Sequence, residues 1–149
     1  MTDAKPLFLP NNIKFAPHPK WRNEIERFSN IASTFHNAIE EIEPEYIGIE
    51  GYSMGSRGMV FNIGENTGIL KYMLYQNLYS FETIAPTKVK KFATGSGRAD
   101  KVKMCEAFTQ ETGIDLGELI FNKPNRVTSP ISDIADSYWI AKFIFDKYS

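Results

Sequence analysis

Apolar residues recur every three or four positions over residues 21–42, and this spacing predicts a long helix. Pro44 disfavours helical geometry at the residue before it, so the helix should end near there. Residues 46–50, YIGIE, then read as a short buried strand that ends on the carboxylate of Glu50. The apolar helix positions are Trp21, Ile25, Phe28, Ala32, Phe35, Ile39 and Ile42.

Further helices and a strand follow a glycine-rich turn. Residues 59–78 predict a second helix, in which Gly64 and Gly68 each cost about 1 kcal/mol against alanine and so indicate close packing. Residues 80–93 begin as a strand. Residues 94–113 then turn through glycines into a third helix, with Val102, Cys105 and Phe108 directed inward.

The C-terminal part predicts an irregular segment and a last helix. Residues 114–130 show no regular apolar repeat. The last helix should start near Ser129–Pro130 or at Ser132, with a serine as its N-cap, and continue over residues 133–148. Four prolines in residues 1–20 allow only short extended edge pieces there. The order of elements predicts one α/β domain over residues 1–149.

Composition narrows the class of protein only slightly. A formal charge of −1 predicts no particular partner, and Cys105, as the only cysteine, excludes an intramolecular disulfide. No apolar run approaches the ~20 residues that span a bilayer, and the N-terminus lacks the order of a signal peptide. We therefore expect a cytoplasmic protein without a membrane partner, in the host cytoplasm if it is viral.

The last helix carries two acids one turn apart. Asp133 and Asp136 lie on one face, at the margin of the apolar side, and like charges at this spacing repel by a few tenths of a kcal/mol. Their place near the helix start, where the dipole favours negative charge, is one sufficient explanation. Together with Glu50 they would instead make the hard-oxygen set that Mg²⁺ prefers, and such ions can activate water against a phosphodiester.

Residues 86–104 hold six basic residues and one acid, Asp100, a net charge of +5. A solvated helix face is the ordinary interpretation, and a surface for nucleic-acid phosphates is the other. The GSGR turn offers backbone N–H groups to phosphate, but it lacks the order of a nucleotide-triphosphatase loop. The basic residues are Lys88, Lys90, Lys91, Arg98, Lys101 and Lys103.

Other reactive residues point to structure more than to chemistry. His18 and His36 have no partner at ligand spacing, and Cys105 falls on the inward side of its helix. Tyr52, just past Glu50, could stack on an unpaired base or could pack over its own turn.

Taken in order, four segments resemble the RuvC family of Holliday junction resolvases, particularly its phage and viral branches, over residues 21–145. They are PEYIGIE, SMGSRGMVFNIGENTGIL, PTKVKKFATGSGRADK and SDIADSYWIA. The resemblance implies a ribonuclease H-like fold, a mixed sheet flanked by helices, and homodimers that nick branched DNA using Mg²⁺ or Mn²⁺. It also implies site roles: a catalytic carboxylate at Glu50, a C-terminal pair at Asp133 and Asp136, and basic site residues at Lys90 and Lys101.

One feature of that family has no counterpart in these residues. The family opens with a strand that carries a first aspartate. The only early aspartate here is Asp3, and the residues around it are neither apolar enough nor numerous enough to form that strand. Without that strand we expect a sheet edge open to pairing.

Two functions therefore remain open. One is a metal-dependent, structure-selective DNA endonuclease. The other is a catalytically impaired module that binds branched nucleic acid or serves in a larger assembly.

Overall fold

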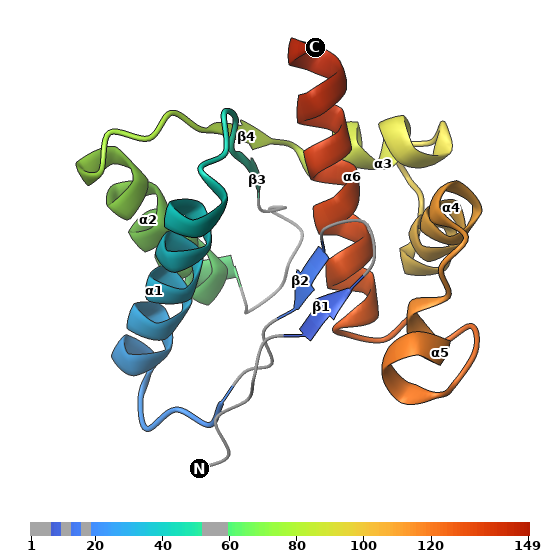
Figure 1. The fold of residues 1–149 in the computed structure, drawn as a ribbon, viewed down its shortest axis with the longest axis horizontal. Helices are drawn as coiled ribbons and strands as arrows, with labels where there is room; N and C mark the ends of the chain where they lie inside the picture. The colour runs from blue at the N-terminus through green and yellow to red at the C-terminus, as the bar shows by residue number, and fades with distance from the viewer. Residues whose placement is uncertain (1–6, 10–12, 16–18, 52–59) are drawn as a thin grey trace.

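The computed structural model describes residues 7–9, 13–15, 19–51 and 60–149. There, two N-terminal strands precede an alternation of helices and strands that ends in four helices (Figure 1). The strands are β1 (Leu7–Leu9), β2 (Ile13–Phe15), β3 (Gly48–Glu50) and β4 (Glu82–Ile84). The helices are α1 (Glu24–Ile42), α2 (Val60–Gln76), α3 (Pro86–Thr94), α4 (Lys101–Thr112), α5 (Leu116–Phe121) and α6 (Ile131–Tyr148).

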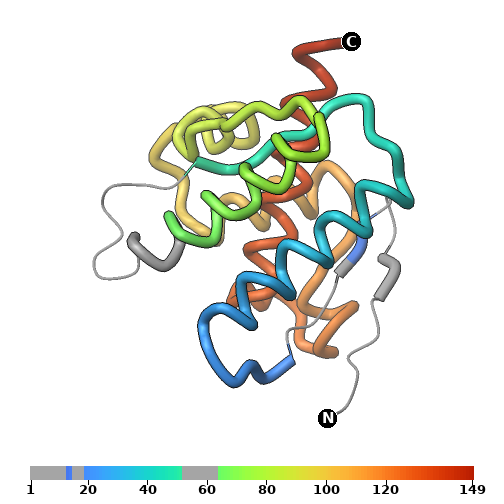
Figure 2. Tube along the Cα trace, turned by 90° about the vertical axis from the view of Figure 1, so that its left-hand side faces the viewer, coloured from blue at the N-terminus to red at the C-terminus, as the bar shows by residue number. Residues whose placement is uncertain are grey.

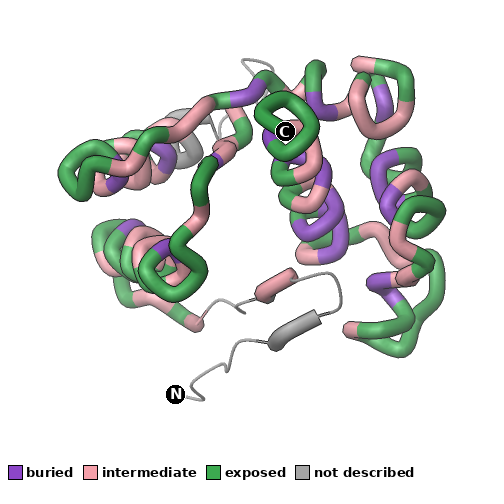
Figure 3. Tube along the Cα trace, turned by 45° about the horizontal axis from the view of Figure 1, so that its top comes forward, coloured by how far each residue is buried: buried purple, intermediate pink, exposed green. Residues whose placement is uncertain are grey.

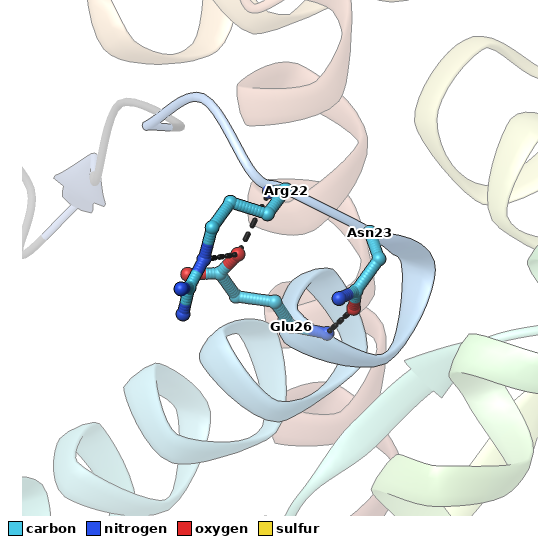
Figure 4. Close-up of polar contacts among 3 residues, drawn as sticks. All are labelled: Arg22, Asn23 and Glu26. Atoms are coloured by element: carbon cyan, nitrogen blue, oxygen red, sulfur yellow. Dashed lines mark hydrogen bonds and ion pairs between the residues drawn. The ribbon is translucent and has the colours of Figure 1, made fainter.

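Helix α1 begins at Asn23, which acts as its N-cap. The Asn23 side chain accepts a hydrogen bond from the backbone N–H of Glu26 at 2.9 Å (Figure 4). In turn, the carboxylate of Glu26 accepts from the backbone N–H of Arg22 at 2.7 Å. Backbone donors at the start of the helix are thus satisfied by side chains, as helix termini require.

The expected apolar stripe of α1 is confirmed at its centre and wrong at its ends. Phe28 and Ile39 are buried, whereas Ile25 and Ile42 are 72% and 63% exposed. Figure 2 shows α1 and α2 side by side, and the two helices pack against each other. Ile39 joins a core cluster with Ile47 and with Leu74 of α2, whereas Ile25 and Ile42 belong to no core cluster of the described residues.

The strands form two separate pairs, β1 with β2 antiparallel and β3 with β4 parallel. Beyond β3, the N–H of Gly51 donates to the carbonyl of Ile84 at 2.7 Å, so the backbone is held on both sides of Glu50. Side chains alternate along a strand, which puts Gly48 and Glu50 on one face. A Cβ atom on Gly48 would lie 2.8 Å from two isoleucines of α6, so this face lies against α6.

Helix α6 is the centre of the core. One apolar cluster joins it to β4, α3 and α4, and a second joins it to α4 and α5. A third cluster lies between α1, β3 and α2. Figure 3 shows buried positions along α6 on the side of the α3–α5 helices. The parallel strand pair thus lies between the α1–α2 layer and α6.

Two short helices were not expected from the sequence. Residues 86–94 form α3 directly after the strand, with Pro86 in its first turn and Gly95 as a left-handed C-cap. Within the segment expected to be irregular, α5 forms because the Asp115 side chain caps its first turn and accepts from the N–H of Glu118 at 3.0 Å. Helix α3 has nine residues and α5 has six, so neither extends over three full turns.

Three packing expectations are wrong. A Cβ atom on Gly64 or Gly68 would meet nothing described within 4 Å, so these glycines do not mark a close approach. Val102 is 45% exposed, although Cys105 and Phe108 are buried as expected.

The predicted serine N-cap of α6 is also wrong. The N-cap position is Pro130, which has no side chain able to cap. Ser132 lies inside the helix and is buried, and its hydroxyl has no hydrogen-bond partner among the described residues. None of the described helices has the length and apolar character needed to cross a bilayer.

Candidate active site

Glu50 is the last residue of β3, and its side chain is exposed on the strand face that turns toward α6. The parallel partner β4 fixes the strand on one side, and Gly48 lets α6 approach it closely. The carboxylate therefore stands at the end of a rigid strand beside the start of α6. Gly48 lies against Ile140 and Ile144 of α6, and the Glu50 carboxyl group, two residues further along the strand, feels the charges of Asp136 and Asp133.

Asp133 and Asp136 lie in the first two turns of α6. Asp133 is exposed, and one of its carboxylate oxygens, Oδ2, accepts a hydrogen bond from the hydroxyl of Ser129. Asp136 is half-buried one turn further on. Both aspartates flank the buried face of the helix, as their spacing predicts.

The electrostatics of these groups are coupled. Although Glu50 is exposed as a residue, its carboxyl group is partly withdrawn from water, and this, then the charge of Asp136, raises its pKa to about 7, while Lys90 opposes the rise. Burial, then the charge of Asp133, raises the pKa of Asp136 to about 6. Lys90 and Lys101 lower that pKa. The fold thus brings three acids and two lysines within range of one another.

Coordination of one ion by all three acids is not complete in this conformation. Among the described residues, no three acidic, histidine or cysteine side chains lie close enough together to hold a metal. The donor chemistry nevertheless fits a hard divalent cation, because burial and the repulsion between the carboxylates raise their pKa values more than Lys90 and Lys101 lower them. Glu50 is exposed, and no hydrogen bond to its side chain is present among the described residues, so it is free to turn toward such an ion.

The basic segment lies on α3, α4 and the turn between them. Lys88, Lys91 and Arg98 are exposed, as are both lysines at the start of α4. Within the described residues, none of the six basic side chains of residues 86–104 forms an ion pair, whereas Arg27, Lys142 and other cations do. Cations left unpaired beside acids with raised pKa values are available to an anion.

The turn that joins α3 to α4 is held by hydrogen bonds and tight packing. Thr94 donates its hydroxyl to the carbonyl of Lys90 at 2.8 Å, and the N–H of Arg98 donates to the Ser96 hydroxyl at 3.3 Å. A Cβ atom on Gly97 would lie 3.3 Å from the carbonyl of Thr87. The close approach of Gly97 to Thr87 thus packs the turn against the first residues of α3.

The remaining candidates divide into three groups. His18 and Tyr52 lie outside the described residues. His36 lies 3.6 Å from the carboxylate of Glu40 on α1, away from the acids of α6. Burial raises the pKa of Cys105 to about 11, which keeps the thiol protonated and fits the expected core position.

The contact between Ser129 and Asp133 is one that the sequence analysis does not predict. The sequence favours Ser129 only as an N-cap, but its hydroxyl donates a hydrogen bond to Asp133. The signal was present as a serine four residues before an aspartate, a separation that brings side chains together at a helix start.

Comparison with known proteins gives a family and a fold. The profile of the family described as "Crossover junction endodeoxyribonuclease RuvC" matches residues 19–110. That range contains Glu50 and the basic segment but ends before the aspartates of α6. A protein of Corynebacterium diphtheriae, crossover junction endodeoxyribonuclease RuvC, is 28% identical over 103 residues, which are 68% of this chain and 61% of the relative. This chain thus spans about three fifths of that relative's length.

Two solved structures from Thermus thermophilus have a similar fold. One is RuvC, with a TM-score of 0.64, and the other is RuvC in complex with Holliday junction substrate, with a TM-score of 0.65. Each is 15% identical, and the similarity covers 92% of this chain and 78% of the other. The expected α/β fold of ribonuclease H-like type is therefore confirmed. The single mixed sheet that the resemblance implies is not present in the described residues, where one antiparallel and one parallel pair of strands remain separate.

Proposed function

Because the chain belongs to the RuvC family of crossover junction endodeoxyribonucleases, we propose that it is a metal-dependent endonuclease that cuts four-way and other branched DNA. The solved relative in complex with a Holliday junction supports this class of substrate. The observation that carries the proposal is the coupling of Glu50, Asp133 and Asp136 beside unpaired lysines. Acids alone would repel DNA, and cations alone would bind it without hydrolysis.

The three carboxylates are proposed to hold the divalent ion, either Mg²⁺ or Mn²⁺, with Glu50 turning toward the two aspartates. When bound, such an ion supplies an activated water and a counter-charge for the leaving oxygen of the phosphodiester. Strand β3 and helix α6 keep the ligands on rigid elements, which is what such positioning requires.

The basic residues are proposed to bind phosphates. Lys101 begins α4 next to Asp136 and would contact the scissile phosphate, and Lys90 would neutralise the same region. The DNA backbone on either side would lie along Lys88, Lys91, Arg98 and Lys103, and Tyr52 is proposed to stack on a base. Since a four-way junction needs two cuts, we propose that the chain acts as a homodimer.

A second function is favoured by the incomplete coordination. Among the described residues no three ligands meet, and the chain matches only part of its curated relative. A catalytically impaired module that binds branched DNA, or a subunit of a larger assembly, would have these properties.

Cleavage of a labelled four-way junction separates the two functions. In Mg²⁺ we expect the chain to nick the junction, and Glu50→Gln and Asp136→Asn to lower the rate at least about 100-fold, since electrostatic positioning supplies most of phosphoryl-transfer catalysis. Asp146→Asn, an exposed acid near the far end of α6, is the matched control and should cut normally. Binding without any cleavage by the unaltered chain would refute the endonuclease and support the module.

A further inference from the structure

Strand β3 has one edge that no described strand covers. Within the described ranges, β3 pairs with β4 alone. The N–H of Gly51 donates to the carbonyl of Ile84 at 2.7 Å, and Ile47 likewise bonds to β4 through its carbonyl. Backbone groups of successive residues point to opposite edges of a strand, so the N–H and carbonyl of Gly48 and of Glu50 point away from β4. This edge therefore offers the donors and acceptors that a further strand needs.

A groove with a volume of about 500 Å³ lies beside Gly48, between β3 and helix α6. The helix side of the groove is one face of α6, because its lining residues recur every three or four positions. They are Ser137, Ile140, Ala141, Ile144, Phe145 and Tyr148. None of them is charged, and Tyr148 stacks on Tyr46 of the opposite wall with ring centroids 4.6 Å apart. The groove thus joins an unpaired strand edge to an uncharged helix face.

Apolar side chains of this groove remain open to solvent. Phe145 is 68% exposed and Tyr148 is 46% exposed, whereas Ile140 and Ile144 beside them are buried. A two-stranded sheet is marginal by itself, and an edge with unpaired backbone groups is a template for another extended chain. Free backbone groups beside an apolar wall are the features by which proteins bind a peptide as an added strand.

The charged residues at the two ends of this edge are acids. Glu45 is the one charged side chain among the described residues that line the groove, and Glu50 ends the strand. Neither forms an ion pair with another described residue. Five residues of extended backbone span roughly 16 Å, so a bound strand of about six residues would bring each of its ends close to one acid. Charge complementarity therefore favours a partner segment with basic ends and an apolar middle.

We propose that the free edge of β3 binds an extended segment of a partner protein, which adds to the β3–β4 pair as a third strand. The backbone of the segment bonds to Gly48 and Glu50. Its apolar side chains pack against Ala141 and Phe145 of α6, and its basic ends lie near the two acids. This binding is separate from DNA cleavage and needs no metal ion.

A blocked synthetic peptide, Lys-Val-Thr-Val-Thr-Val-Lys, is the probe for this site. It is titrated into the isotope-labelled full chain while the backbone amide signals are followed. We expect the amide signals of Gly48 and Glu50 to shift most and to saturate. Ala141→Arg should weaken binding at least about tenfold, because a long cationic side chain would occupy the groove and repel the peptide. Gln76→Arg adds the same charge to an exposed position of α2 and should leave the affinity unchanged.

Two methylated peptides test the backbone pairing itself. Methylation of the valine nitrogens removes donors from one edge of the peptide, and methylation of the threonine nitrogens removes them from the other. Since only one edge of the peptide would face β3, we expect one methylated peptide to lose binding and the other to keep it. A peptide with glutamate in place of both lysines should bind at least about threefold more weakly.

Each result supports or overturns the proposed strand site. Equal behaviour of the two methylated peptides would mean that the backbone of β3 does not pair with the probe, and equal weakening by Ala141→Arg and Gln76→Arg would exclude the groove. The absence of shifts at Gly48 and Glu50 up to about 1 mM peptide would overturn the site altogether. The amide spectrum of each variant before titration shows whether it is folded.

Discussion

Glu50 should destabilise the metal-free chain at alkaline pH, and replacing it with glutamine should relieve that effect. Its pKa rises from 4.5 to about 7 on folding, chiefly through loss of water contact and then through Asp136. A carboxyl whose pKa is raised by folding contributes stability below its unfolded pKa, and that contribution is lost as the pH rises through the folded pKa. The free energy of unfolding should therefore fall between about pH 4.5 and pH 7.

The size of the effect follows from the same values. The difference between 4.5 and about 7 corresponds to at most roughly 3 kcal/mol between the charged and neutral forms. Because the side chain is exposed on one side, solvent screening reduces this to ~1 kcal/mol. Glu50→Gln should then be more stable than the unaltered chain by ~1 kcal/mol at pH 8 and equal to it at pH 4.5.

Urea denaturation in the presence of a chelator, at both pH values, measures this directly. In thermal unfolding, the same gain of ~1 kcal/mol corresponds to a rise of roughly 3 °C in the midpoint temperature for a chain of this size. Asp146→Asn removes the same charge from an exposed position of α6 and should show no such pH dependence. If Glu50→Gln is destabilising at pH 8, or has the same effect at both pH values, the acids do not interact as described.

Three further results are expected. Mg²⁺ should raise the unfolding midpoint more at pH 8 than at pH 5.5, because protonated carboxylates bind it poorly; an equal rise contradicts this. Gly48→Ala should lower the free energy of unfolding by about 1–3 kcal/mol, since its Cβ would lie 2.8 Å from side chains of α6. Gly64→Ala, at a position with open space, should raise it by ~0.5–1 kcal/mol. Equal effects of the two substitutions would contradict the close approach of β3 to α6. Lys91→Gln should reduce the salt dependence of junction binding by about one ion, and Lys123→Gln should leave it unchanged; matching slopes would mean that the basic segment does not contact phosphate.

The long elements could be predicted from the sequence because their patterns are local. The apolar period of α1 extends over five turns, and the change from helix to strand at Pro44 is marked by proline itself. Helix α5 could not be predicted in this way. It depends on Asp115, which also accepts from the N–H of Asn125 at 3.0 Å, and on Gly117, where a Cβ would lie 2.4 Å from the carbonyl of Lys123. Both contacts are made with the segment that follows α5 and depend on how that segment folds back, which a local sequence pattern does not show.

The candidate site is likewise predictable from the sequence only in part. The spacing of Asp133 and Asp136 fixes their common face on a helix, but the approach of Glu50 depends on β3 packing against α6 through Gly48. The spacing of residues in the sequence does not predict that contact. The residues alone therefore leave open whether Glu50 lies near Asp133 and Asp136, and only the family resemblance predicts that it does. Which branch of the family the chain belongs to remains a prediction.

The most direct test of the account asks whether the three acids bind one ion. Paramagnetic Mn²⁺, added at well below one equivalent to isotope-labelled protein, broadens the amide signals of residues close to the bound ion. We predict that the amides of Glu50, Asp133 and Asp136 broaden together and first, and that excess Mg²⁺ reverses the effect. Broadening at Asp133 and Asp136 without Glu50, or spread over exposed acids such as Asp146, would contradict a shared metal site.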